Sequence, residues 1–235
     1  MKRFNSVQFI LDLITNCFIK DSNIEVSNVN SKIVEMKNLF NGVQFQEITK
    51  DQFYIIKDIH NSPLGLNLLS ILKRNDPKEL ELIKNIFNLE ANFLAYGIIF
   101  YNRVDEILKY GLNKRCSVMI DAEQSYIQIF IDSCAKFFSF NYNKEFCTVL
   151  QTVQCYLKES YHTSQEYLNF LKKNNLKIGV KIVRGAYMTE EAKLAQRFNY
   201  ENPIFPTIEE THKSYNSLIE VLLGLTNKDD KVKII

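Results

Sequence analysis

The feature of this sequence that most limits its fold is a regular alternation of short apolar segments with helical patterns from Ser117 onward. Between Ser117 and Ile178 the strand-like segments begin about 30 residues apart, a spacing typical of parallel β-α units. Such units join by right-handed crossovers, either into a (βα) barrel or into a doubly wound sheet. The sequence contains neither G-x-G-x-x-G nor G-x-x-x-x-G-K-[ST], the usual nucleotide-binding loops. The pattern therefore favours a barrel.

Five segments carry the short apolar pattern of strands, and helical periodicity fills most of the sequence around them. The expected strands are Phe53–Lys57, Ser117–Ile120, Phe146–Leu150, Ile178–Val183 and Lys231–Ile235. The expected helices are Val7–Phe18, Val34–Phe40, Leu66–Arg74, Lys78–Tyr110 with an interruption near Gly97 and a C-cap at Gly111, Tyr126–Phe138, Tyr161–Lys173, Glu190–Phe198 and Ile208–Leu225. Thr207 and Glu210 fit the capping box of the last helix.

These elements predict an α/β fold of the TIM-barrel type, (βα)8, preceded by helices. We expect a helical segment over residues 1–50 and a partial (βα) barrel over 51–235. A closed barrel has eight strands, and the five expected here leave it incomplete at the C-terminus.

The composition is that of an ordinary globular protein and argues against several kinds of function. Of the 235 residues 46% are hydrophobic and 24% are charged, and the net charge of +2 without a basic stripe argues against nucleic acid as a partner. The five cysteines form no C-x-x-C pair and the three histidines are not spaced as ligands, which argues against a zinc site. No apolar run approaches the ~20 residues of a membrane span.

The stretch Lys177–Tyr187, K-I-G-V-K-I-V-R-G-A-Y, combines a buried strand with a polar end. Its β-branched residues are typical of a strand, and Gly185 permits the tight bend that follows. A strand that ends in a cation, a glycine and an aromatic residue presents these groups at its C-terminal edge. In parallel α/β folds that edge is where ligands bind.

Polar side chains follow most of the expected strands, and parallel strands would bring them to one face. They are Lys57, Asp121, Glu123, Gln124, Gln151, Gln154, Lys181, Arg184 and Tyr187. Lys181 and Arg184 stand three residues apart in a strand and are expected on opposite sides. An inward lysine needs a partner, for which Asp121 or Glu123 is suited. Two other interpretations are open: ordinary strand-end caps and salt bridges, or a Schiff-base aldolase that uses Lys57 or Lys181.

Four motifs follow one another in this part of the sequence: D-A-E-Q-S-Y (121–126), Q-T-V-Q-C-Y-L-K (151–158), G-V-K-I-V-R-G-A-Y-M (179–188) and Y-E-N-P-I-F-P-T-I-E-E-T-H-K-S-Y-N (200–216). As an ordered set they resemble the motifs of the proline dehydrogenase family, most closely its eukaryotic mitochondrial type. The resemblance implies a distorted (βα)8 barrel that holds FAD at the C-terminal ends of its strands. It implies oxidation of L-proline to pyrroline-5-carboxylate, with hydride transfer to the flavin and electrons passed on to quinone.

The resemblance also implies a role for each matching residue. Lys181 is the cation near the flavin N5 region, Asp121 orients it, and Lys57 is its partner on the first strand. The remaining expected cofactor-binding residues are Gln151 as a hydrogen-bond partner of the isoalloxazine, Arg184 on the phosphate or ribitol side, and Gly185. Ala186, also cofactor-binding, forms with Tyr187 part of the wall beside flavin and proline. The family implies a mitochondrial location on the matrix side of the inner membrane, with peripheral contact to that membrane.

The sequence departs from the family pattern at three places. Val153 stands where the family has tyrosine, and Asp58-Ile59-His60 replaces T-A-L after Lys57. The paired arginines that bind the carboxylate of proline in this family lie beyond Ile235. The alternative interpretation is therefore a catalytically impaired fragment or a non-enzymatic remnant of the same family.

Overall fold

The computed structural model describes Gln8, Leu11, Glu25, Ser27, Ser31, Thr49, 67–86, Leu89, 91–226 and 232–235. The chain divides into two compact units, Met1–Glu106 and Ile107–Ile235. The expected strand Phe53–Lys57, with Lys57, lies outside the described residues, as does the expected helix Val34–Phe40. The expected boundary between residues 50 and 51 stays a prediction.

The second unit contains a parallel sheet, as the alternating pattern predicts. Its strands are β1 (Val118–Ile120), β2 (Val149–Gln154), β3 (Ile178–Val183) and β4 (Val232–Ile234), and their order in the sheet is their order in the chain. Each strand pairs in parallel with the next. A sheet without a reversal of strand order is the arrangement of a (βα) barrel, because a doubly wound sheet has a switch point.

The expected bounds of three strands agree with the structure to within one residue, but the prediction for β2 was wrong. β2 begins three residues later than Phe146 and continues through Gln154. Its start is fixed by Asn143, whose side chain donates to the carbonyl of Val149 at 2.8 Å and accepts from its amide at 2.7 Å. The last residues of β2 include Gln151, Thr152 and Gln154, which are polar. The apolar run that predicts the strand therefore ends before the backbone pairing ends.

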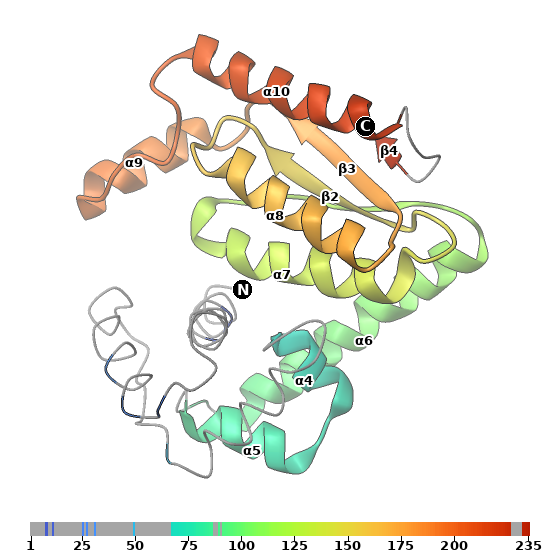
Figure 1. Ribbon diagram of the computed structural model, residues 1–235. Helices are drawn as coiled ribbons and strands as arrows, with labels where there is room; N and C mark the ends of the chain where they lie inside the picture. Colours follow the sequence, from blue (N-terminus) through green and yellow to red (C-terminus); the bar gives the residue numbers. More distant parts are fainter. Residues whose placement is uncertain are drawn as a thin grey trace. The chain divides into compact units, whose positions relative to one another are not determined.

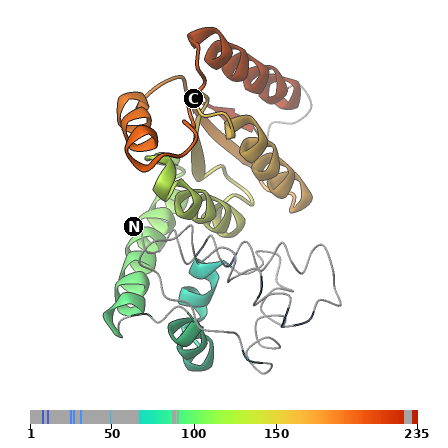
Figure 2. The same cartoon turned by 90° about the vertical axis from the view of Figure 1, so that its left-hand side faces the viewer.

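The second unit contains the helices α7 (Ser125–Tyr142), α8 (Ser160–Lys173), α9 (Met188–Phe198) and α10 (Ile208–Thr226), close to the predicted ranges. Of these, α7, α8 and α10 cover one face of the sheet. Val153, Ile178, Val180 and Ile182 pack with buried residues of α7, α8 and α10. In both views α9 stands apart from the row α7, α8 and α10, near the arrowheads of β2 and β3 (Figures 1 and 2). The predicted capping box is confirmed. The backbone amide of Glu210 donates to Thr207 Oγ1, and the backbone amide and the hydroxyl of Thr207 both donate to Glu210 Oε2.

The first unit contains α4 (Leu68–Arg74) and α5 (Pro77–Ile86), and α6 (Ala91–Asn113) runs from this unit into the second. The helical pattern predicted these elements, but the interruption near Gly97 was wrong, since α6 continues through that residue. The cap at Gly111 was also wrong. Arg115, with φ of 52°, takes the left-handed position, and the amides of Arg115 and Cys116 bond to the carbonyls of Leu112 and Gly111. These two bonds form a Schellman motif with arginine in place of the usual glycine.

Among the helices of the described residues, none is both long enough and apolar enough to cross a bilayer.

Gly179 in β3 allows β2 and β3 to approach closely. A Cβ at this position would lie 2.6 Å from the carbonyl oxygen of Val149 and 2.6 Å from Cys147 Sγ. Both distances are far inside van der Waals contact, so only glycine fits here without movement of the backbone.

Candidate active site at the carboxyl edge of the sheet

The carboxyl ends of β1, β2 and β3 meet at one edge, where Lys181 and Asp121 form an ion pair. Thr152 and Lys181 are Cα partners in the register of β2 and β3, and Asp121 follows β1 directly. Lys181 Nζ lies 2.6 Å from Asp121 Oδ1, and Thr152 Oγ1 donates to the same oxygen at 3.3 Å. The expected pairing of Lys181 with an acid of the Asp121 segment is therefore confirmed.

The ion pair holds Asp121 in its ionised form. The hydrogen bond from Lys181 is the main cause that lowers the pKa of Asp121 below its ordinary value of 3.8. The Asp121 side chain is 71% exposed and that of Lys181 is 29% exposed, so the pair adds little to stability, under about 1 kcal/mol. Its chemical consequence is orientation: the carboxylate fixes an ammonium group at the edge where ligands bind.

A titration of Asp121 tests this pair. We expect the Asp121 carboxyl to titrate below 3.8 in a carbon-detected NMR experiment, and to return toward 3.8 in Lys181→Met. Because the folded pKa lies below the unfolded one, the pair stabilises the fold above the unfolded pKa. That stabilisation is lost as the pH falls through the folded value. An Asp121 pKa that is the same in wild type and Lys181→Met would contradict the pairing.

The segment between β3 and α9 places Tyr187 beside Glu123. A hydrogen bond with Glu123 is the main cause that raises the pKa of the Tyr187 hydroxyl. The Tyr187 amide donates to the hydroxyl of Tyr156 at 3.4 Å, and Tyr156 is fully buried. Gly185 and Ala186 are exposed just before it. A Cβ on Gly185 would meet only the flexible Met188 Sδ, at 3.2 Å, so the bend itself does not require glycine.

Arg184 points away from the ion pair. Its guanidinium lies over the ring of Tyr215 in α10, 4.8 Å from the ring centre. Lys181 faces Asp121 on the other side of the sheet, so the opposite orientation of Lys181 and Arg184 is confirmed. The cation–π contact holds Arg184 on the helix-covered side, at the strand end.

Gln151 is not brought together with Lys181. It lies inside β2 rather than after it, in register with Val180 on the helix-covered face. Its amide donates to Asp132 of α7 at 2.7 Å. The amide that reaches the strand end on the Lys181 side is that of Gln154, which is 4% exposed and donates to the carbonyl of Glu123 at 2.8 Å. Side chains alternate between the two faces of a strand, so a strand extended to Gln154 would have placed Gln154 on the same face as Thr152.

Glu191 fastens α9 to the start of α7, and no sequence signal identified it. It is 1% exposed, and its carboxylate accepts from the amide of Ser125 at 2.5 Å and from the hydroxyl of Ser125 at 2.7 Å. Its partner is distant in the sequence, and an acid in the first turn of a helix is ordinarily a solvent-exposed helix-dipole partner. Glu191 therefore ties the segment that carries Tyr187 to the one that carries Glu123.

Removal of the Glu191 carboxylate is expected to destabilise the chain. Glu191→Ala leaves the partly buried amide and hydroxyl of Ser125 without their acceptor, so we expect a loss of about 2 kcal/mol in the free energy of unfolding. The measurement is urea denaturation, with the exposed neighbour Glu190→Ala as matched control. Equal effects of the two substitutions would mean that the contact with Ser125 contributes nothing.

The described residues contain no group of three or more His, Cys, Asp or Glu side chains placed to hold a metal ion. Hydrogen-bonding groups suited to an organic ligand are present instead. Lys181 is an ammonium donor, and the buried Oε1 of Gln154 has no hydrogen-bond partner in the described part of the chain. One cation and one buried acceptor at the same strand edge suit a polar, planar ligand with both acceptors and N–H donors.

Comparisons with known proteins agree with this architecture. The model of the family described as proline dehydrogenase matches residues 5–235. Proline dehydrogenase 1, mitochondrial, of Dictyostelium discoideum is 33% identical over 230 residues, which are 96% of this chain and 35% of that protein. The human protein of the same name is 31% identical over 132 residues, 56% of this chain and 22% of its own length.

A solved structure shows the same fold at low sequence identity. Proline utilization A (PutA) from Bdellovibrio bacteriovorus, inactivated by N-propargylglycine, superposes with a TM-score of 0.51 at 19% identity. The match covers 57% of this chain and 14% of that chain, so this chain spans a small part of the solved protein and about a third of the Dictyostelium relative. Because the family model matches nearly the whole sequence, the chain belongs to the proline dehydrogenase family.

Proposed function

We propose that this chain forms the flavin-binding part of a proline dehydrogenase, which oxidises L-proline to pyrroline-5-carboxylate. The observation that carries the proposal is the Asp121–Lys181 ion pair at the carboxyl edge of a parallel sheet, in a chain of this family. In this reaction a C–H bond next to nitrogen breaks with loss of hydride, the nitrogen loses a proton, and a C=N bond forms. FAD, when bound, would supply the hydride acceptor.

The residues at the strand edge fit a flavin. An isoalloxazine ring presents both acceptor atoms and an N–H donor along its edge. Lys181 can donate to the acceptors, and the unpaired Oε1 of Gln154 can accept from the N–H. We therefore assign the amide role to Gln154 in place of Gln151, whose side chain bonds to Asp132.

Each residue of the cluster has a separate task in this proposal. The positive charge of Lys181 would stabilise the negative charge that develops on reduction, and Asp121 would keep the ammonium in place. Ala186 and Tyr187 would form a wall beside flavin and proline. Arg184 and Gly185 would lie toward the ribitol or phosphate side, and Lys57 would complete the cationic pocket.

Relatives suggest the partners and the location. The curated relatives from Dictyostelium, Drosophila and human are named mitochondrial, and we extend this location to the present chain. We also propose quinone as the electron acceptor, reached through peripheral contact with the matrix side of the inner membrane. Fractionation of cells that express the tagged chain would test the location, and a cytosolic pool alone would contradict it.

A visible spectrum of the purified chain with FAD tests the function. We expect a retained flavin band that bleaches when L-proline is added without oxygen. A band that is retained but does not bleach would favour the alternative, a catalytically impaired chain that keeps the cofactor site. A chain that retains no flavin after gel filtration would contradict the proposal.

A further inference from the structure

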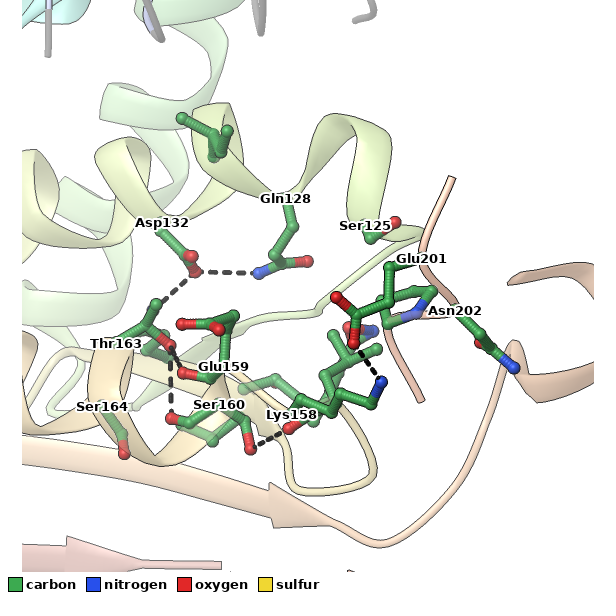
Figure 3. A pocket seen from close by; sticks show the side chains of 17 residues that line it. Ser125, Gln128, Asp132, Lys158, Glu159, Ser160, Thr163, Ser164, Glu201 and Asn202 are labelled. Atoms are coloured by element: carbon green, nitrogen blue, oxygen red, sulfur yellow. Dashed lines mark hydrogen bonds and ion pairs between the residues drawn. The ribbon is translucent and has the colours of Figure 1, made fainter. Parts of the chain in front are cut away.

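A cavity lies between α7 and α8 at the end of β2, and neither Asp121 nor Lys181 lines it. It has a volume of about 460 Å³ and is enclosed by the first half of α7, the end of β2, the start of α8 and residues 201–203 (Figure 3). Gln151 and Val153 line it from the helix-covered face of β2, and Thr152 and Gln154 of the candidate active site line it as well. We call it the α7–α8 cavity. The proposed flavin site gives no role to Gln128, Asp132 or Gln151.

The inner end of this cavity is built from polar side chains that bond to one oxygen. Gln128 Nε2 and Gln151 Nε2 donate to Asp132 Oδ1 at 2.8 and 2.7 Å. Gln128 Oε1 accepts from the amide of Glu123 at 2.9 Å, which fixes the orientation of that side chain. Oδ1 of Asp132 is therefore an acceptor of two hydrogen bonds, and the cluster is a rigid assembly rather than a set of mobile surface groups.

The hydrogen bonds within this cluster leave two of its acceptor atoms open. Gln151 is 5% exposed, and its Oε1 has no hydrogen-bond partner among the described residues. Gln128 and Gln151 both donate to Oδ1 of the partly exposed Asp132, so neither of them occupies its Oδ2. A buried carbonyl oxygen without a donor is unfavourable by about 1–3 kcal/mol. Both atoms belong to side chains that line the cavity, so they favour an occupant that donates hydrogen bonds.

The charge around the cavity favours a cation. Lys158 Nζ is paired with Glu201 Oε1 at 2.6 Å, which neutralises both. Glu159 is an exposed acid at the start of α8, and Lys136 acts on Asp132 from the next turn of α7. Burial is the main cause that raises the pKa of Asp132, with the two amides and Lys136 opposing. A partly buried carboxylate is stabilised by an adjacent positive charge.

The walls favour an organic cation over a metal ion. Ile129, Val153, Leu157 and Pro203 supply apolar surface beside the polar end. Asp132 is the single acid of the inner cluster, and the described residues hold no group of three acids, histidines or cysteines suited to a metal. A short alkyl group would contact the apolar wall while its nitrogen lies at the polar end.

We propose that the α7–α8 cavity binds a small primary or secondary alkylammonium ion, whose N–H groups donate to Gln151 Oε1 and Asp132 Oδ2. The atoms proposed to hold this ion differ from those proposed to hold the flavin, because Gln151 and Lys181 lie on opposite faces of the sheet. Occupation of the site would also couple β2 to α7 and α8.

The probe for this site is n-butylammonium chloride, titrated into the isotope-labelled full chain and followed by NMR. Tetramethylammonium chloride at equal concentration is the control, because it has the same charge without N–H donors. We expect saturable shifts of the Gln151 and Gln128 side-chain amides with butylammonium alone. Equal binding of the two cations, or no shift at millimolar butylammonium, would overturn the proposal.

Substitutions identify the atoms involved. Asp132→Asn and Gln151→Met keep the shape of each side chain and are each expected to weaken butylammonium at least about tenfold. Gln165→Met is the matched control, since Gln165 carries a buried unpaired amide nitrogen outside the cavity. Circular dichroism checks that each variant folds. If Gln151→Met does not fold, the affinity of Asp132→Asn and the comparison of the two cations test the proposal. Unchanged affinity in folded Asp132→Asn would overturn the proposal.

Discussion

Replacement of Lys181 by methionine is expected to slow the reduction of flavin by proline by about 100-fold or more. Methionine keeps the length of the side chain and removes its positive charge. Loss of one preorganised donor to a developing negative charge typically lowers a rate by this factor. The measurement is anaerobic stopped-flow absorbance of the flavin band, with proline in excess.

The matched control is Lys233→Met. Lys233 is in register with Gly179, on the same face of the sheet as Lys181, and its ammonium donates to Ser117 Oγ at 2.9 Å near the opposite edge. Its loss changes the net charge equally but leaves the carboxyl edge intact. Flavin retention should be measured in both variants, so that a slower rate is not confused with loss of cofactor. Equal rates in Lys181→Met and wild type would remove Lys181 from the proposed mechanism.

The second large effect is expected at Gly179. Gly179→Ala should lower the free energy of unfolding by about 3 kcal/mol, at the upper end of the range for overpacked cores. The added methyl would stand 2.6 Å from the Val149 carbonyl oxygen and 2.8 Å from Leu150 Cγ, and a backbone oxygen in a paired strand cannot move aside. Urea denaturation followed by circular dichroism would measure the change.

Two controls separate sterics from the general cost of a glycine replacement. Gly185→Ala meets only Met188 Sδ and is expected to change stability by less than about 0.5 kcal/mol. Gly179→Ala combined with Cys147→Ala removes the contact with Sγ but keeps the one with the Val149 carbonyl, so partial rescue is expected. Full rescue in the double variant would show that the backbone of β2 does move.

Sequence patterns predicted the sheet well where apolar residues and pairing end together. The bounds of β3 follow from its β-branched run, because every residue of that run also pairs with β2 or β4. In β2 the apolar run ends before the backbone pairing does. Thr152 and Gln154 are paired with β3 although they are polar, and their side chains lie on the face of the candidate site.

The ion pair could be predicted, and two other parts of the site could not. Lys181 is a cation inside a strand, so the requirement for a nearby acid follows from electrostatics alone. Gln151 was given the amide role because it begins a recognised motif, but strand alternation directs it toward Asp132. Glu191 contacts Ser125 across the fold, and no local pattern encodes a partner so distant in the sequence.

Local structure in α6 shows a similar division. Helical periodicity predicted most of this long helix, but the predicted break at Gly97 and the predicted cap at Gly111 were wrong, because α6 continues through both residues. Gly111 is required for another reason: a Cβ there would lie 3.0 Å from the carbonyl oxygen of Cys116 and 3.1 Å from Val118 Cγ2. Tertiary packing explains the residue, and that packing is absent from the local sequence.

The order of the strands has a consequence for synthesis on the ribosome. Each strand pairs with the strand translated just before it, so the sheet can grow by one β-α-β unit at a time as the chain emerges. Closure of each step involves only the intervening helix and loops, which keeps the entropy of each closure small. β2 can rest on β1 and α7 before β3 has left the exit tunnel. Nascent chains arrested after α9, in which β2 has emerged and β3 has not, should therefore already resist protease within the segment from β1 to β2.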